Sequence, residues 1–229
     1  MRRQRLLSIA RELMSHPTAP FREHRVRQHI RAFAKDRGLT VRGDRMGNLV
    51  ATTPGETGRQ TLAFEAHMDH PGFLIEADSR RGRTTALFHG SVEERYFRGA
   101  GVRVFGEGRE VTGRVRRTEF KPRKREKRAW LDVDGEVHRG DFAMWDLEPF
   151  RVDGDRLVTR ACDDLVGCAT ILALIDELQR RGIERRVRCV FTAAEEGGLH
   201  GAKYLCSHHR LAKKTRVVAI ETSMELPQA

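Results

Sequence analysis

The sequence predicts an α/β fold with a covered, mixed sheet and a small all-β, barrel-like domain inserted into it. Segments with helical periodicity and apolar strand-type segments occur in both terminal parts of the chain. Between about residues 72 and 159 the sequence changes to short alternating segments separated by glycine and charge, without a convincing helix. We therefore expect one α/β domain made of residues 1–71 and 160–229, and an inserted all-β domain over residues 72–159.

The expected elements follow in chain order. Residues 6–37 predict two helices interrupted at residues 16–21 and ended by Gly38. Short strands are expected at residues 39–41, 48–51 and 61–66, and within the insert at residues 85–88, 102–105, 110–115 and 129–133. The last part predicts a helix at 165–181, a strand at 188–192, a helix at 201–211 and a strand at 216–220.

Composition limits the class of protein. The 229 residues are 39% hydrophobic and 33% charged, which is typical of a soluble globular chain. No apolar run approaches the ~20 residues that span a bilayer, and the basic N-terminus lacks the apolar core of a signal peptide. The four cysteines have neither CxxC spacing nor the pattern of a disulfide framework. These features predict a cytoplasmic protein without a membrane partner.

The net charge of +11 raises the possibility of nucleic-acid binding. The excess is diffuse, however, and the single basic run, residues 121–128, lacks the interleaved aromatic residues of single-strand binders. We favour a solvated loop between strands for this run, with a polyanion or partner contact as the alternative. Nucleic acid is not the expected partner.

Chemistry-bearing residues gather where the predicted strands end. The strand at 188–192 leads into Glu195 and Glu196, which we expect to face opposite sides and to have different roles. His67 follows another strand with Asp69 on the same side, as suits a metal-binding imidazole with a supporting carboxylate, although a surface histidine is the simpler interpretation of His67 alone. Glu221 follows the last strand.

Asp163 and Asp164 precede the predicted helix at 165–181. Helix capping is the simplest explanation of such a pair, and one residue can cap while the other binds a metal. Two divalent ions ~3.5–4 Å apart need a bridging carboxylate and further nitrogen and oxygen ligands. The candidate ligands are His67, Asp163, Glu196 and Glu221. Glu195 would remain off the metals as general base, and zinc, cobalt or manganese would suit the set.

Three stretches carry a resemblance to a known family: residues 66–73, residues 140–143 through 163–168, and residues 191–202. Together they resemble the tetrahedral aminopeptidases, of the glutamyl or deblocking type, among the co-catalytic zinc exopeptidases. That resemblance implies a zinc-exopeptidase-like catalytic domain carrying a small β domain. It also implies two metal ions per subunit, zinc before cobalt or manganese, and assembly into large closed homo-oligomers.

The resemblance also implies residue roles. His67 would bind the first metal with support from Asp69, and Asp163 would bridge both metals. Glu196 would bind the second metal, and Glu195 would take the proton from the attacking water. Glu221 occupies the place of the remaining ligand to the first metal, where the family usually has aspartate.

Two features depart from the family pattern. Relatives continue past this point and supply a final histidine ligand, whereas no histidine follows Glu221, so we expect a C-terminally incomplete chain. The position matching His200 is not a ligand in the family. Leu165 stands where the family often has arginine.

The implied reaction is hydrolysis of N-terminal peptide bonds by water that the two metals activate. Another two-metal amidohydrolase or deacylase is an alternative, and it predicts activity on blocked substrates. A two-carboxylate glycosidase is a third possibility, but adjacent residues flank a glycosidic bond poorly and His67 would have no role. A non-catalytic basic binding protein is the fourth, and it predicts salt-sensitive polyanion binding.

Overall fold

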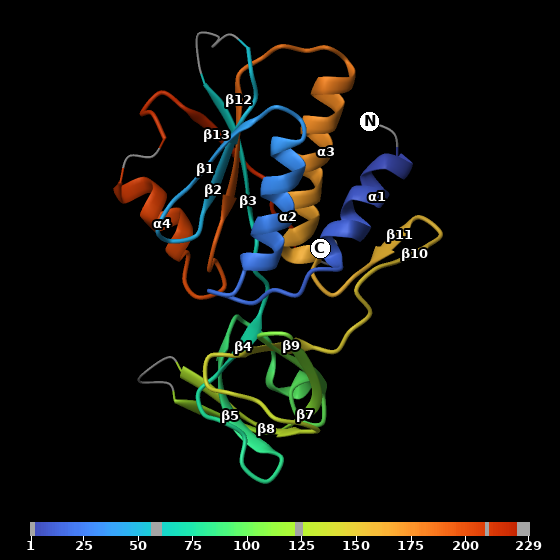
Figure 1. The fold of residues 1–229 in the computed structure, drawn as a ribbon, viewed down its shortest axis with the longest axis vertical. Helices are drawn as coiled ribbons and strands as arrows, with labels where there is room; N and C mark the ends of the chain where they lie inside the picture. Colours follow the sequence, from blue (N-terminus) through green and yellow to red (C-terminus); the bar gives the residue numbers. More distant parts are fainter. Residues whose placement is uncertain (1–2, 56–60, 122–125, 209–210, 224–229) are drawn as a thin grey trace, which may run out of the picture.

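The computed structural model describes residues 3–55, 61–121, 126–208 and 211–223. Figure 1 shows an α/β part stacked above a small barrel along the long axis of the molecule. The two parts are joined where strand β3 leads into β4 and where the chain returns after β9.

The α/β part contains a five-stranded mixed sheet. Its strand order is β1-β2-β12-β3-β13. Strands β12, β3 and β13 run parallel, whereas β1 and β2 pair antiparallel. The strands are β1 (Thr40–Gly43), β2 (Leu49–Thr52), β3 (Leu62–His67), β12 (Val187–Thr192) and β13 (Arg216–Ala219). Because the carboxyl ends of parallel strands meet at one edge, the segments that follow β3, β12 and β13 come together there.

Helices cover this sheet unequally. Three helices lie together on one face, and a short fourth lies on the other (Figure 1). They are α1 (Arg3–Met14), α2 (His24–Lys35), α3 (Gly167–Arg180) and α4 (His200–Ser207). The apolar positions that predicted the helices are the buried ones, among them Leu13, Ile30 and Leu172. The predicted helices and sheet strands are therefore confirmed, with boundaries shifted by a few residues.

The insert contains a closed six-stranded barrel in the order β4-β5-β8-β7-β6-β9, which confirms the barrel-like prediction. Its strands are β4 (Gly72–Ile75), β5 (Arg83–His89), β6 (Gly101–Gly106), β7 (Arg109–Lys121), β8 (Glu126–Val133) and β9 (Phe142–Trp145). The turn η1 (Glu94–Tyr96) lies between β5 and β6. The inward side chains form a separate core in which Phe73, Phe88 and Phe97 pack on Trp145. Closure leaves the barrel strands without free edges.

Two segments differ from the sequence prediction. Strands β10 (Arg151–Asp153) and β11 (Arg156–Val158), which we assigned to the insert, form a separate ribbon. This ribbon lies beside α1, where the Arg3 guanidinium donates to the carbonyl of Gly154 at 2.8 Å. Part of the basic run, residues 122–125, lies outside the described residues. The flanking Lys121 and residues 126–128 belong to strands β7 and β8, and Arg128 pairs with Glu76 at 2.7 Å.

None of the described helices is both long enough and apolar enough to cross a membrane.

Candidate metal centre

His67 stands at the end of β3 with 3% of its surface exposed. On one side of the ring, Nδ1 lies 3.1 Å from the main-chain oxygen of Asp69 and 3.6 Å from its Oδ1. A carbonyl oxygen can only accept, so Nδ1 carries a proton and donates. The other ring nitrogen, Nε2, is thereby directed toward the edge of the sheet, where the neighbouring strands end.

Three carboxylates surround Nε2 of His67. Asp163 Oδ1 lies at 2.9 Å, Glu221 Oε1 at 3.9 Å and Glu195 Oε2 at 4.0 Å. Asp163 comes from the short turn η3 (Cys162–Val166), whereas Glu221 and Glu195 follow β13 and β12. Ligand atoms of His67, Asp163 and Glu221 all lie within 4.8 Å of one another. Asp163 and Glu221 are about half exposed, so this cluster opens to solvent.

Burial, together with the crowding of negative charge, changes the pKa values of the cluster. Burial, followed by the nearby charges of Asp163 and Glu195, raises the pKa of Glu196 to about 7. Burial is also the main cause of the raised pKa of Glu195. Burial alone would lower the pKa of His67, but hydrogen bonds to Asp163 and Asp69 outweigh it and raise that pKa to about 11. The site therefore favours a positive charge at its centre.

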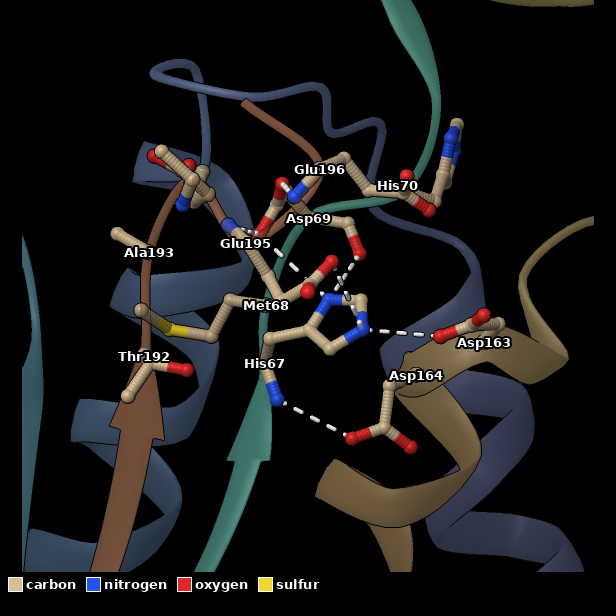
Figure 2. Close-up of polar contacts among 12 residues, drawn as sticks. His67, Met68, Asp69, His70, Asp163, Asp164, Thr192, Ala193, Glu195 and Glu196 are labelled. Carbon is tan, nitrogen blue, oxygen red and sulfur yellow. Dashed lines mark hydrogen bonds and ion pairs between the residues drawn. The ribbon is translucent and has the colours of Figure 1, made fainter. Parts of the chain in front are cut away.

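Asp69 is fully buried and organises the segment after β12. Its Oδ1 accepts the backbone N–H of Glu195 at 3.0 Å, and its Oδ2 accepts that of Glu196 at 3.1 Å (Figure 2). One carboxylate thus contacts the imidazole of His67 and fixes the main chain of both glutamates. Asp69 thus lies beside His67, and its supporting role at a metal site stays a prediction.

The alternating-face argument for Glu195 and Glu196 was wrong. Strand β12 ends at Thr192, and the glutamates lie in a turn in which Gly198 and Leu199 donate back to the carbonyl of Glu195 at 2.7 and 2.8 Å. Ala194 has φ of 52°, a left-handed conformation that takes the chain out of the strand before the pair. Alternation of side chains applies only to extended backbone.

Asp163 and Asp164 have different surroundings, and the metal-binding role of Asp163 stays a prediction. Asp164 is buried, and its Oδ1 accepts the N–H of Gly167 at 3.1 Å at the start of α3. Its Oδ2 accepts the N–H of His67 at 3.1 Å, so the capping residue also ties η3 to β3 (Figure 2). Burial raises the pKa of Asp164 to about 8. Asp163 is left to face the imidazole.

The sequence of this chain is similar to those of known aminopeptidases. Residues 47–226 match the model of the M42 glutamyl aminopeptidase family, which is most of the chain. The chain belongs to this family. It is 27% identical over 192 residues to a candidate aminopeptidase of Acetivibrio thermocellus, covering 79% of this chain and 56% of that relative. The M42 chain described here therefore spans little more than half the length of that relative.

Several solved structures are similar to this chain in fold. The TET1 peptidase of Pyrococcus horikoshii superposes with a TM-score of 0.77 at 26% identity, over 94% of this chain and 68% of that one. The aminopeptidase APDkam598 of Desulfurococcus kamchatkensis superposes with a TM-score of 0.78 at 25% identity, over 96% and 64%. An endoglucanase of Thermotoga maritima, at 24% identity with a TM-score of 0.69 over 93% and 65%, shares the fold.

Two further residues that hold the main chain beside the candidate metal centre were not recognised in the sequence. Glu23, 4% exposed and just before α2, accepts the N–H groups of Phe21 at 2.8 Å and Ala194 at 2.9 Å through Oε1. Burial, then the charge of Asp69, raises the pKa of Glu23 to about 7. Asn48 Oδ1 accepts the N–H of Ala193 at 3.0 Å. In the sequence both residues look like ordinary helix-start and turn residues, because the main-chain groups of Ala193 and Ala194 that they hold lie more than 140 positions away.

The remaining predicted residues lie at different distances from the centre. The three converging ligands do not include Glu196, which instead lines a hollow with His89 and Lys127 of the barrel. His200 is exposed and packs its ring on Phe21 at 5.3 Å between centroids. It is not part of the group of converging ligands found among the described residues.

Proposed function

We propose that this chain is the catalytic part of a metal-dependent aminopeptidase that hydrolyses N-terminal peptide bonds. One observation carries the proposal: His67, Asp163 and Glu221 converge within 4.8 Å at the carboxyl edge of the sheet. Family membership supports the reaction class, since relatives in the M42 family are aminopeptidases by name. The domain would then be of the zinc-exopeptidase type, with residues 72–159 as its insert.

The donor set suits divalent metal ions. An imidazole nitrogen with several carboxylates fits zinc, and also cobalt or manganese, and like charges packed this closely need a cation between them. We assign His67, Asp163 and Glu221 to a first ion, with Asp163 shared and Glu196 contributing to a second. When bound, such ions would polarise the scissile carbonyl and lower the pKa of an attacking water toward ~7.

Glu195 is the residue we assign as general base. Its carboxylate lies 4.0 Å from the imidazole of His67, beside the converging ligands but outside that group of three. It would accept the proton of the attacking water and deliver it to the leaving amine. Asp69 would act as a positioning residue, because it holds the N–H groups of Glu195 and Glu196.

Peptides with a free N-terminus are the proposed substrates, and a homo-oligomer is the proposed assembly. The Pyrococcus horikoshii relative assembles into a tetrahedron or a large octahedral shell, which supports self-association of this chain's family. A cytoplasmic location stays a prediction from the spacing of the four cysteines in the sequence.

Metal content and activity of the purified chain test the proposal. We expect bound zinc by mass spectrometry, and release of leucine from a free peptide but not from its N-acetylated form. A chelator should abolish that release and zinc should restore it. His67→Ala should lose the metal, whereas the exposed Glu136→Gln should not.

Three results would contradict the proposal. If the purified, folded protein bound none of zinc, cobalt and manganese, this cluster would not be a metal site. Cleavage of only the acetylated peptide would favour a deacylase. Cleavage of a glycoside that a chelator does not inhibit would favour a two-carboxylate glycosidase.

A further inference from the structure

A hollow of about 320 Å³ lies where the barrel meets the α/β part. Most of its wall is apolar: Pro71, Val92, Tyr96, Ala100, Trp145 and Leu147. Ring contacts to Phe73, Phe88 and Phe97, at 5.0–5.4 Å between centroids, hold the side chain of Trp145 in place in this wall. A volume near 300 Å³ with an apolar lining and few polar groups is typical of a small-ligand site.

His70 and Arg160 supply the polar part of the wall and connect it with the candidate metal centre. His70 directly follows Asp69, and Arg160 precedes Asp163 by three residues. His70 is 3% exposed, and its Nδ1 lies 2.8 Å from the carbonyl of Pro71, so the proton sits on Nδ1. Its Nε2 has no partner among the described residues. Burial lowers the pKa of His70 to about 4, so the imidazole is neutral at pH 7.

Arg160 is a partly buried cation that pairs with no carboxylate of the described residues. Nη2 donates to the main-chain oxygen of His16 at 2.6 Å, and Nε has no hydrogen-bond partner among the described residues. No acidic side chain of the described chain lies within 4 Å of its guanidinium. Burial, with a smaller contribution from Arg103, lowers the pKa of Arg160 to about 10. It is still charged at neutral pH.

Among the described residues, most of the hydrogen-bond donors of Arg160 have no acceptor, because its guanidinium donates to one carbonyl oxygen. A guanidinium offers five N–H donors in a planar fork that matches a carboxylate, and a buried charge costs free energy unless it is paired. Arg103, which is also only partly exposed, shows the contrast, because it binds Asp146 at 2.7 Å and Glu110 at 2.9 Å.

We propose that this hollow is a substrate subsite in which Arg160 binds a peptide carboxylate and the apolar wall holds the attached carbon chain. The inference rests on the proposed aminopeptidase function and extends it to a class of substrate. The carboxylate is either the side chain of an acidic residue or the C-terminus of a short peptide. Both present the same group to the guanidinium, and the experiment below separates them.

Fluorescence of Trp145 reports binding without catalysis. In a Trp130→Phe background, Trp145 is the sole tryptophan of the chain. We titrate metal-free protein, kept in chelator, with 4-phenylbutyrate and with the neutral 4-phenylbutanamide. We expect the carboxylate to quench Trp145 and to bind on the order of tenfold more tightly than the amide, as a charge-assisted hydrogen-bonded pair should. Equal affinity for the two probes would overturn the inference without any further variant.

Variants then assign the effect to Arg160. Arg160→Gln should bring the affinity for 4-phenylbutyrate down to that for the amide, and Arg160→Lys should restore part of the difference. Arg103→Gln is the matched control, because it removes a neighbouring positive charge that already has carboxylate partners. Unchanged phenylbutyrate binding by folded Arg160→Gln, or an equal loss in Arg103→Gln, would contradict the assignment.

Competition by peptides identifies the source of the carboxylate. Glu-Leu-amide carries only the side-chain carboxylate, Leu-Leu carries only the C-terminal one, and Leu-Leu-amide carries neither. Displacement of 4-phenylbutyrate by either of the first two, but not by the third, supports the subsite and names its ligand. Displacement by none of them overturns the peptide assignment. Since no hydrolysis is measured, this outcome is separate from failure of the aminopeptidase proposal.

Discussion

Replacement of Asp69 by asparagine tests how the segment after β12 is held. The carboxylate accepts one backbone N–H on each oxygen, at 3.0 and 3.1 Å, and is fully buried. Asparagine offers one oxygen, and its NH₂ group would face the second N–H. One hydrogen bond to a charged acceptor is then lost, worth about 1.5–3 kcal/mol, and a buried donor is left unpaired. We expect a loss of about 3 kcal/mol in the free energy of unfolding.

Urea unfolding of metal-free protein in chelator measures this loss separately from metal binding. For a chain of this size about 3 kcal/mol corresponds to a Tm lower by roughly 6–12 °C. The control is Asp155→Asn, whose side chain is 97% exposed, and we expect it to change stability by less than about 0.5 kcal/mol. If Asp69→Asn unfolds like the control, the carboxylate does not fix the glutamate segment and the positioning role is refuted.

The other predictions concern zinc affinity, pH and packing. Asp69→Asn should also weaken zinc binding about 10–100-fold, as loss of a carboxylate behind a metal-binding histidine does, measured by competition with a chromophoric chelator; unchanged affinity would contradict that role. Glu23 keeps its proton to a pKa of about 7 when folded and loses it near 4.5 when unfolded, so stability should fall by about 2–4 kcal/mol between pH 4.5 and 7 and then level off. Glu23→Gln should flatten this dependence in urea titrations, and an unaltered slope would assign it elsewhere. Gly201→Ala would place a Cβ 2.5–2.6 Å from the main chain of Ala193 and should cost about 1–3 kcal/mol, whereas Gly101→Ala meets only Asp146 at 3.5 Å and should be tolerated.

Local pattern was sufficient to predict most elements of this fold, although the barrel strands β4 and β9 were not among those named. Helical periodicity placed α1, α2 and α3, and the change to alternating segments placed the barrel, because both signals arise from which side chains are buried. The order of the strands could not be predicted in the same way. Strand β12 lies between β2 and β3, and that pairing depends on contacts between segments far apart in the chain.

The same limit applies to the candidate site. Residues that end strands, such as His67 and Glu221, were visible because the apolar strand before each one marks its place. Glu23, Asn48 and Arg160 were not, since nothing near them in the sequence distinguishes a buried partner from a surface polar residue. The turn after Thr192 was predicted as extended backbone. Ala194 adopts a left-handed conformation there, and an alanine in a sequence does not indicate such a conformation.

Buried carboxyl groups hold the main chain of the candidate site in place, although the candidate ligands themselves are partly exposed. Asp163 and Glu221 are about half exposed and Glu195 about one third, so packing alone cannot fix them. Buried acceptors fix the neighbouring main chain instead: Asp164 accepts the N–H of His67, Asp69 accepts those of Glu195 and Glu196, and Glu23 accepts that of Ala194. Each is a carboxyl group whose oxygens accept backbone N–H groups, and such a bond strengthens when the carboxyl group is ionised. Substitutions in this buried layer should therefore lower stability and metal affinity together, whereas substitutions of Asp163 or Glu221 should lower metal affinity while leaving the metal-free protein folded.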